Sequence, residues 1–255
     1  MAQRLHQSLQ HEYSLYVEQE IEHYKESVSR GVLLGIGDEA VQALASQQQL
    51  ALTELILCDE VDRIIRARLR LPAYTTWRRR RVRALKEFSR PERWGLNPNE
   101  PIVREVPTTS DRHVLVAGTA AEGPAIYLAA KGCAVTSVEA EEEIVERVIS
   151  RAVEVGLTGR VRGFVSDLGA WRPDIPLNAV VCTPAAFRGL SDSERAHVIT
   201  LLQNATADGG VHLVQTLLAG QKGLSVDELR QRYSGWHVEM HDDARETFLA
   251  RKAVA

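Results

Sequence analysis

The chain has 255 residues, of which 44% are hydrophobic and 25% are charged, and its formal net charge is −3. This composition is typical of a globular protein with one large or two small domains, and the charge gives no overall signal for nucleic-acid binding. Three widely separated cysteines without a Cys/His cluster argue against a disulfide framework and against a structural metal site.

Residues 1–107 have the apolar spacing of helices. The first residues lack a signal-peptide core and no run is long enough to span a membrane, so we expect a cytoplasmic protein without a membrane partner. Helices are predicted over residues 9–30, over 38–46 with Asp38 as N-cap after a GVLLGIG turn, from about Thr53 until Pro72, and over 77–88. Residues 97–111 contain three prolines and are expected to be a linker or surface crossing. We therefore divide the chain into an α-helical cap or dimerisation region, residues 1–107, and a second domain, residues 108–255.

Two features of the helical region have more than one interpretation. Tyr13, Tyr16 and Tyr24 share one helix face, and we favour core packing for them over an aromatic lid on a cofactor site. Residues 63–93 contain twelve basic residues against two acidic ones, an excess of ten positive charges. Residues 111–255 have 15 basic and 19 acidic residues, a net charge of −4 that can neutralise part of this excess. Consecutive arginines also spread over all faces of a helix, so we favour a structural or homodimer interface over an anionic substrate or nucleic acid.

From residue 113 onward, strand and helix patterns alternate. Strands are predicted over residues 113–117, 134–138, 161–165, 178–183, 210–216, 236–240 and 246–251, and helices over about 121–131, 140–155, 191–206 and 225–233. The HDDAR segment between the last two strands is too short for a helical crossover, so these strands should form an antiparallel hairpin. The predicted fold class is α/β, with a seven-stranded, mainly parallel sheet, a terminal hairpin and an α-helical N-terminal region.

The stretch HVLVAGTAAEGPAIYLAAKGCAVTSVE, residues 113–139, carries the clearest functional signal. It combines a buried strand, a turn of small residues at Gly118, a helix, and a second strand that ends in Glu139. Such a turn lets a ligand approach backbone N–H groups, and a carboxylate at this place can accept hydrogen bonds from two ribose hydroxyls. The pattern predicts a nucleoside-containing cofactor, although Glu139 could instead cap the helix that follows.

Six segments in order make residues 111–253 resemble the class I S-adenosylmethionine-dependent methyltransferases, and within them the small-molecule branch with tellurite-resistance and thiopurine methyltransferases. They are VLVAGTAAEG (114–123), the strand end at Glu139, VSDLGAW (165–171), NAVVCTPAAF (178–187), ADGGVHLVQTL (207–217), and the pair GWHVEM (235–240) and ETFLARK (246–252). The resemblance implies a Rossmann-like methyltransferase sheet, S-adenosylmethionine as cofactor and a small-molecule acceptor.

The same resemblance implies roles for single residues. The residues expected to contact the cofactor are Ala117, Gly118, Thr119, Ala120, Gly123, Glu139, Ala140, Asp167, Leu168 and Thr183. Glu139 would bind the ribose, and Asp167 with the Leu168 amide would bind the adenine, although Asp167 could instead close an Asx turn. Thr183 and Phe187 would face the methyl group, and Tyr16 would shield the reacting centre if the first helix folds over it. These last three are the predicted catalytic residues.

The glycine turn departs from the family pattern. The family's first strand usually ends with an acid followed by Gly-x-Gly-x-Gly, whereas this chain has Val116 for the acid and Ala120 and Glu122 for the second and third glycines. Glu122 would repel the cofactor's carboxylate unless its side chain turns away. In a register shifted by one residue, Gly118, Ala120 and Gly123 line the turn. This spacing also matches a dinucleotide fingerprint with one substitution.

The sequence thus predicts S-adenosylmethionine-dependent methyl transfer to a small molecule. No catalytic dyad is visible among the eight histidines, which is compatible with this chemistry because the sulfonium is already activated and positioning supplies much of the rate. Two alternatives remain open: a catalytically degenerate methyltransferase fold that serves as a binding or assembly module, and an NAD(P)-dependent oxidoreductase. As partners we expect the acceptor and a second copy of the chain, while nucleic acid is not favoured.

Overall fold

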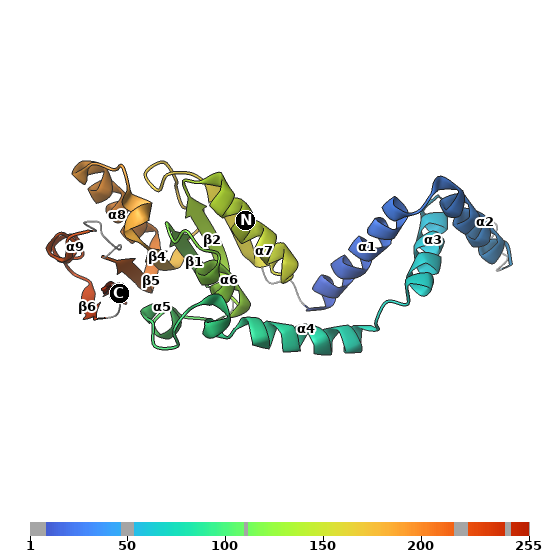
Figure 1. Ribbon diagram of the computed structural model, residues 1–255, viewed down its shortest axis with the longest axis horizontal. Helices are drawn as coiled ribbons and strands as arrows, with labels where there is room; N and C mark the ends of the chain where they lie inside the picture. Colours follow the sequence, from blue (N-terminus) through green and yellow to red (C-terminus); the bar gives the residue numbers. More distant parts are fainter. Residues whose placement is uncertain (1–8, 47–53, 110–111, 217–223, 243–245, 255) are drawn as a thin grey trace. The chain divides into compact units, whose positions relative to one another are not determined.

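The computed structural model describes residues 9–46, 54–109, 112–216, 224–242 and 246–254 (Figure 1). Residues 7–82 form one compact unit, here called the helical unit, and residues 83–255 form a second, the sheet unit. Helix α4 (Tyr74–Phe88) continues from the first unit into the second. Residues 83–107, which the sequence assigned to the helical region, belong to the compact unit that contains the sheet.

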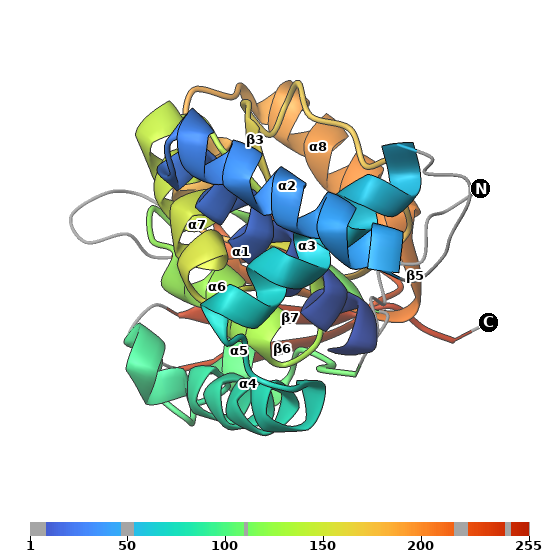
Figure 2. The same cartoon turned by 90° about the vertical axis from the view of Figure 1, so that its right-hand side faces the viewer.

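The helical unit consists of α1 (Leu9–Ser27), α2 (Arg30–Ser46), α3 (Glu54–Leu69) and the beginning of α4. Helices α2 and α3 lie side by side, and α1 also contacts α3 (Figure 2). The buried residues that these helices share are Tyr13, Val17, Ile21, Ile36, Ala40, Ile64 and Ile65. The predicted α-helical N-terminal region is confirmed.

The predicted turn at residues 31–37 and the N-cap at Asp38 are wrong, because both lie inside α2. The carbonyl of Ser29 accepts the first hydrogen bonds of this helix. A glycine in a helix interior costs about 1 kcal/mol relative to alanine, which is why the glycines indicated a turn. However, Ile36 and Ala40 of the same segment are fully buried, so tertiary packing outweighs the local preference.

Tyr13 lies at the centre of an aromatic cluster in the helical unit. Its ring centroid is 5.4 Å from those of Tyr74 and Trp77 and 6.4 Å from that of Tyr16. Its hydroxyl accepts a hydrogen bond from Arg66 at 2.9 Å. The tyrosines therefore contribute to the core of this unit, as we favoured from their spacing.

Part of the basic stretch is neutralised within the helical unit. The pairs are Arg63 with Glu60 (2.6 Å), Arg81 with Glu12 (3.0 Å) and Arg68 with Glu39. The side chains of Arg81 and Glu12 are only 12% and 17% exposed, so this pair is shielded from solvent. Arg78, Arg79 and Arg80 are exposed on α4.

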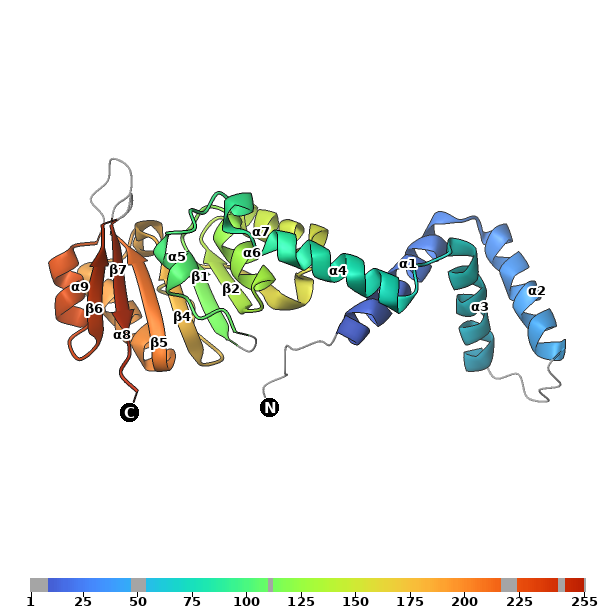
Figure 3. The ribbon, with the colours of Figure 1, turned by 90° about the horizontal axis from the view of Figure 1, so that it is seen from below.

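The sheet unit contains a seven-stranded sheet with the order β3-β2-β1-β4-β5-β7-β6 (Figure 3). The strands are β1 (His113–Ala117), β2 (Ala134–Glu139), β3 (Val161–Val165), β4 (Leu177–Cys182), β5 (Thr206–Gln215), β6 (His237–His241) and β7 (Thr247–Arg251). The first five are parallel to one another, and β7 is antiparallel to both β5 and β6. The predicted Rossmann-like methyltransferase sheet with a terminal hairpin is confirmed.

Helices cover both faces of this sheet. Helices α5 (Pro101–Arg104), α6 (Gly123–Ala130) and α7 (Glu142–Glu154) share a core with one face, and α8 (Asp192–Ala205) and α9 (Val226–Arg232) share a core with the other. Val114 and Val116 of β1 point to the first core, and Leu115 and Ala117 point to the second. Strands buried on both faces require apolar residues at consecutive positions, which explains the unbroken apolar runs.

The stretch at residues 97–109 is not the surface linker that the sequence predicts. Ile102 and Val106 are 7% and 4% exposed and belong to the core beneath α6. The polar residues and prolines around them suggested a linker, but two buried side chains are enough to fix the segment on the sheet unit.

A buried hydrogen-bond chain joins β5 to the helices on the second face. His212 is fully buried, with Nδ1 2.7 Å from the Tyr233 hydroxyl and Nε2 2.7 Å from the Thr206 hydroxyl. The Thr206 hydroxyl donates to the Leu202 carbonyl (2.7 Å), so it accepts from Nε2–H, and Nδ1 accepts from Tyr233. Burial lowers the pKa of His212 to about 3, and the imidazole is therefore neutral in the folded protein.

Candidate functional site

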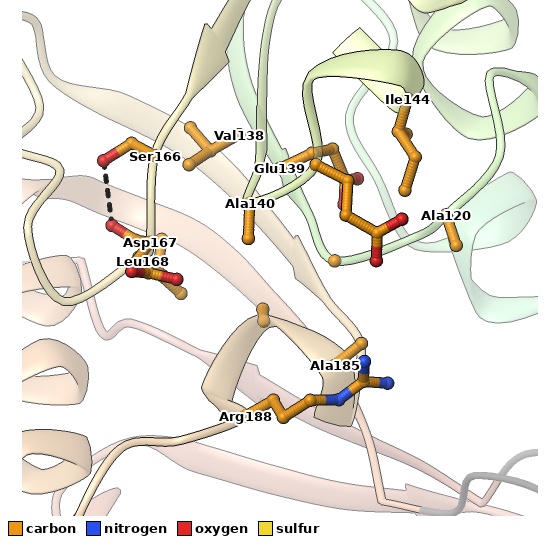
Figure 4. Close-up of a pocket in the computed structure, with 13 residues that line it drawn as sticks. Ala120, Val138, Glu139, Ala140, Ile144, Ser166, Asp167, Leu168, Ala185 and Arg188 are labelled. Atoms are coloured by element: carbon orange, nitrogen blue, oxygen red, sulfur yellow. Dashed lines mark hydrogen bonds between the residues drawn. The ribbon is translucent and has the colours of Figure 1, made fainter.

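A pocket lies at the carboxyl ends of β1, β2, β3 and β4. Strand β1 has β2 on one side and β4 on the other, so the chain connections reverse there, and ligands of α/β sheets bind at such a point. The pocket has a volume of about 150 Å³. The residues that line it are Gly118, Ala120, Val138, Glu139, Ala140, Glu141, Ile144, Ser166, Asp167, Leu168, Ala185, Ala186 and Arg188. Figure 4 shows Glu139, Asp167 and Arg188 around it, each from a different segment.

Many of the residues predicted to bind the cofactor meet in this pocket. Those that line it are Gly118, Ala120, Glu139, Ala140, Asp167 and Leu168. The predicted residues outside its lining are Ala117, Thr119, Gly123, Thr183 and Phe187. Tyr16 belongs to the helical unit, where its ring stacks on Trp77 at 6.1 Å, and its catalytic role stays a prediction.

Glu139, the last residue of β2, is 4% exposed and is held by the glycine turn. Its Oε1 accepts hydrogen bonds from the Thr119 N–H (2.9 Å) and from the Thr119 hydroxyl (3.2 Å). Burial raises the pKa of the Glu139 carboxyl, and the hydrogen bonds from Thr119 oppose that shift. The carboxyl is thus fixed beside the pocket by the turn, and the helix that follows begins only at Glu142 with Glu141 as its N-cap.

Asp167 lies in the loop after β3. Its carbonyl accepts the N–H groups of Ala170 (3.0 Å) and Trp171 (3.1 Å), and also the hydroxyl of Ser166 (3.0 Å; dashed in Figure 4). The loop is therefore closed by the main chain and not by an Asx turn. The Asp167 carboxylate has no hydrogen bond to any other described residue, which leaves it available to a ligand.

The glycine turn after β1 has two residues in the left-handed region. Gly118 has φ +67° and Ala120 has φ +54°, and this conformation disfavours any residue with a Cβ. A Cβ on Gly118 would lie 2.3 Å from the backbone nitrogen of Ala186. Gly118 is thus required by the close approach of the segment after β4, in addition to its backbone conformation.

The segment after β4 forms the short helix η3 (Pro184–Phe187), with Thr183 as its N-cap. The Thr183 hydroxyl accepts the Ala185 N–H (3.2 Å) and donates to the Gly118 carbonyl. Phe187 is buried in the core beneath α8. Both predicted catalytic residues of this segment are therefore occupied by contacts within the fold.

Glu122 and Gly123 face away from the pocket. The Glu122 carboxylate lies 3.8 Å from the Arg151 guanidinium, so its charge is directed elsewhere, as the resemblance required. A Cβ on Gly123 would lie 2.5 Å from the Trp94 carbonyl oxygen, so this glycine serves the packing of α6. Val116, at the position of the family's acid, is fully buried in the core.

Sequence reasoning missed the charged residues Glu141 and Arg188. Arg188 follows η3, is exposed, and makes no ion pair with another described residue. No local pattern could have found it, because it reaches the pocket only through the way η3 lies against the turn after β1. Among the described lining residues the charges are three carboxyl groups, on Glu139, Glu141 and Asp167, and one guanidinium.

The lining residues offer hydrogen-bond acceptors that suit the nucleoside half of S-adenosylmethionine. Glu139 and Asp167 offer acceptors at the places that a ribose and an adenine would need. Beside Gly118, on the side toward the ends of β1 and β4, the pocket is bounded by Ala186, whose backbone packs against the glycine. Ala185 and Ala186 of η3 thus form the wall of the pocket beside the glycine turn.

The described residues contain no group of three or more His, Cys, Asp or Glu side chains that could hold a metal ion. Within the same ranges, no helix has the length and apolar character needed to cross a bilayer.

The strand order and the terminal hairpin define an α/β domain with a Rossmann-like methyltransferase fold. No protein-family model matches the sequence. No curated protein matches it either.

Solved structures of similar fold include several methyltransferases. The N-methyltransferase NodS from Bradyrhizobium japonicum WM9 is 13% identical with a TM-score of 0.48, and the match covers 62% of this chain and 99% of that one. TehB from Haemophilus influenzae is 18% identical with a TM-score of 0.47, and the match covers 56% of this chain and 58% of that one. Magnesium protoporphyrin IX methyltransferase from Synechocystis PCC 6803 is 16% identical with a TM-score of 0.48, and the match covers 60% of this chain and 74% of that one. These values are low, so the assignment of the fold rests on the strand order of the protein itself.

Proposed function

We propose that the pocket binds the adenosine part of S-adenosylmethionine and that the chain transfers its methyl group to a small-molecule acceptor. The observation that carries the proposal is the convergence of the Glu139 and Asp167 carboxyl groups on one pocket at the reversal point of the sheet. The choice of a small-molecule acceptor rests on the resemblance of the six segments.

The charge of the lining supports a cationic cofactor. The lining has three carboxyl groups and one guanidinium among its described residues, whereas a dinucleotide would bring an anionic pyrophosphate. Two like unit charges 4 Å apart repel each other by about 4 kcal/mol at an effective dielectric constant near 20. The same carboxyl groups attract the positively charged sulfonium of S-adenosylmethionine. This electrostatic difference supports S-adenosylmethionine over NAD(P), which the oxidoreductase alternative needs.

The residues of the site would act by binding and orienting the reactants. S-Adenosylmethionine supplies an already activated methyl group when it is bound. Alignment of an acceptor with such a group lowers the activation free energy by about 7–11 kcal/mol in well-oriented reactions. Glu139 and Asp167 would orient the nucleoside, and the acceptor would supply its own nucleophile. Thr183 and Phe187 remain proposed neighbours of the reacting centre.

Calorimetry with adenosine and the full chain tests the nucleoside site. We expect Glu139→Gln to weaken binding by about tenfold or more, as for the loss of a hydrogen bond to a charged group. Glu141→Gln is the matched control, because Glu141 also lines the pocket but lies at the N-cap position of α7 and not at the end of a strand, and we expect a change of less than about threefold. Absence of binding at millimolar adenosine, or equal effects of the two variants, would contradict the proposal.

The second candidate is a catalytically degenerate methyltransferase fold that serves as a binding or assembly module. The contact of Ala186 with Gly118 favours it, because the amino-acid half of the cofactor is excluded while η3 stays in place. A protein that binds adenosine but binds S-adenosylmethionine under no condition would be of this kind. Preferential binding of NADH would instead support the oxidoreductase.

We also propose that the helical unit makes a homodimer of a cytoplasmic protein. Apolar side chains are exposed on its helices, among them Leu34 (61%) on α2 and Leu55 (78%) on α3. Val32 and Val41 of α2 are exposed as well, and exposed apolar side chains favour a protein contact where they form one continuous patch. Light scattering of the full chain should give the mass of a dimer, and Leu34→Glu with Leu55→Glu should give a monomer. A monomeric parent protein would contradict this proposal.

A further inference from the structure

Helix η3 closes the pocket on the side formed by β1 and β4. A Cβ built on Gly118 would lie 2.3 Å from the Ala186 nitrogen and 2.8 Å from the Ala186 Cα, so the two backbone segments are in direct contact. Ala185 and Ala186 also line the pocket, and Figure 4 shows Ala185 on the side opposite Glu139. A ligand can therefore extend past Gly118 only if η3 moves.

Thr183 holds η3 in this place. Its side-chain oxygen donates to the Gly118 carbonyl and accepts the Ala185 N–H at 3.2 Å. Its own N–H donates to the Ala117 carbonyl at 3.2 Å, which aligns it with the end of β1. Thr183 is 7% exposed, so water competes poorly for these bonds. One hydroxyl thus connects the glycine turn to η3.

The connectivity of an adenosine derivative decides what this closure excludes. The base and the 5′ substituent leave the ribose at opposite ends. With the base at Asp167 after β3 and the ribose at Glu139 after β2, the 5′ substituent is directed toward the ends of β1 and β4, where η3 lies.

We infer that Thr183 determines which adenosine derivatives the pocket accepts, because it holds η3 as a lid over the amino-acid end. Adenosine enters with the lid in place, whereas S-adenosylmethionine and S-adenosylhomocysteine bind only after the Thr183–Gly118 hydrogen bond opens. The inference rests on the proposed function, since it requires the adenosine site. A ligand that needs an open form binds with an affinity reduced by the fraction of open molecules. The cost of opening the lid thereby offsets the additional affinity that the larger ligands would gain from their additional contacts.

Calorimetry on the full chain with adenosine and S-adenosylhomocysteine tests this selectivity. In the parent protein we expect S-adenosylhomocysteine to bind no more tightly than adenosine. Thr183→Val keeps the side-chain shape and removes both hydroxyl hydrogen bonds, so we expect the affinity for S-adenosylhomocysteine to rise by about tenfold, the size of one to two neutral hydrogen bonds. Adenosine affinity should change by less than about twofold. Thr183→Ser retains the hydroxyl and should keep the parent ratio.

Hydrogen exchange on the parent protein gives a second measurement if Thr183→Val does not fold. The Thr183 N–H, which donates to the Ala117 carbonyl at 3.2 Å and so joins the start of η3 to the end of β1, should stay protected with adenosine and exchange faster with S-adenosylhomocysteine. Equal protection with both ligands would overturn the inference, as would S-adenosylhomocysteine binding a hundredfold more tightly than adenosine to the parent. These results would leave the proposed function standing. Loss of adenosine binding altogether would overturn both.

Discussion

The substitution Gly118→Ala should lower the free energy of unfolding of the sheet unit by about 2–4 kcal/mol. Two separate effects add up to this value. The backbone at Gly118 has φ +67°, which costs a residue with a Cβ about 1 kcal/mol. The added methyl group would also lie 2.3 Å from the Ala186 nitrogen, and forcing a methyl group into a packed region costs about 1–3 kcal/mol. The neighbouring atom is backbone, so it cannot move aside as the end of a flexible side chain can.

Gly189→Ala is the matched control for this experiment. Gly189 has φ +78°, but a Cβ there would meet no atom within 4 Å, so only the conformational cost of about 1 kcal/mol applies. Urea unfolding followed by circular dichroism and by tryptophan fluorescence gives both free energies of unfolding. If Gly118→Ala is no more destabilising than Gly189→Ala, η3 does not press on the glycine turn and the reasoning about the lid is refuted.

Three further predictions concern other parts of the molecule. The pKa of His212 is lowered to about 3 in the folded protein, so between about pH 6.5 and pH 3 only the unfolded chain binds a proton at this residue. The contribution of His212 to the free energy of unfolding is therefore complete above about pH 6.5 and is lost as the pH falls toward 3. At pH 5 the free energy of unfolding should be lower by about 2 kcal/mol. His212→Gln should make the free energy of unfolding, measured by urea titration, less dependent on pH. An unchanged pH dependence in this variant would contradict the prediction. Ala120→Gly should leave stability unchanged or raise it by at most about 1 kcal/mol, because Ala120 has φ +54°; a clear loss in thermal unfolding would contradict this. Mixed RNA and DNA should bind more weakly than micromolar at physiological salt in a gel shift, since Arg81 and other arginines are paired; submicromolar binding would refute the interface interpretation.

The sequence by itself was sufficient for the type and order of the seven strands and of helices α6 to α9 in the sheet unit. The strands at residues 113–117 and 161–165 have the predicted bounds, and the closing hairpin lies where the short HDDAR segment indicated. Hydrophobic periodicity and turn residues are properties of neighbouring positions, so they can be found without the fold. Glu139 could be found for the same reason, because a carboxyl residue at the end of a buried strand is a local pattern.

The packing of distant segments was decided only by the tertiary structure. The glycines of residues 31–37 indicated a turn, yet burial of Ile36 keeps them helical. Arg188 enters the pocket without any local signal. Thr183, predicted to face the methyl group, instead bonds to Gly118, which is 65 positions away along the chain. The sequence can supply the hydroxyl and the glycine, but their contact depends on how η3 lies over the end of β1, and that arrangement exists only when the whole sheet has formed.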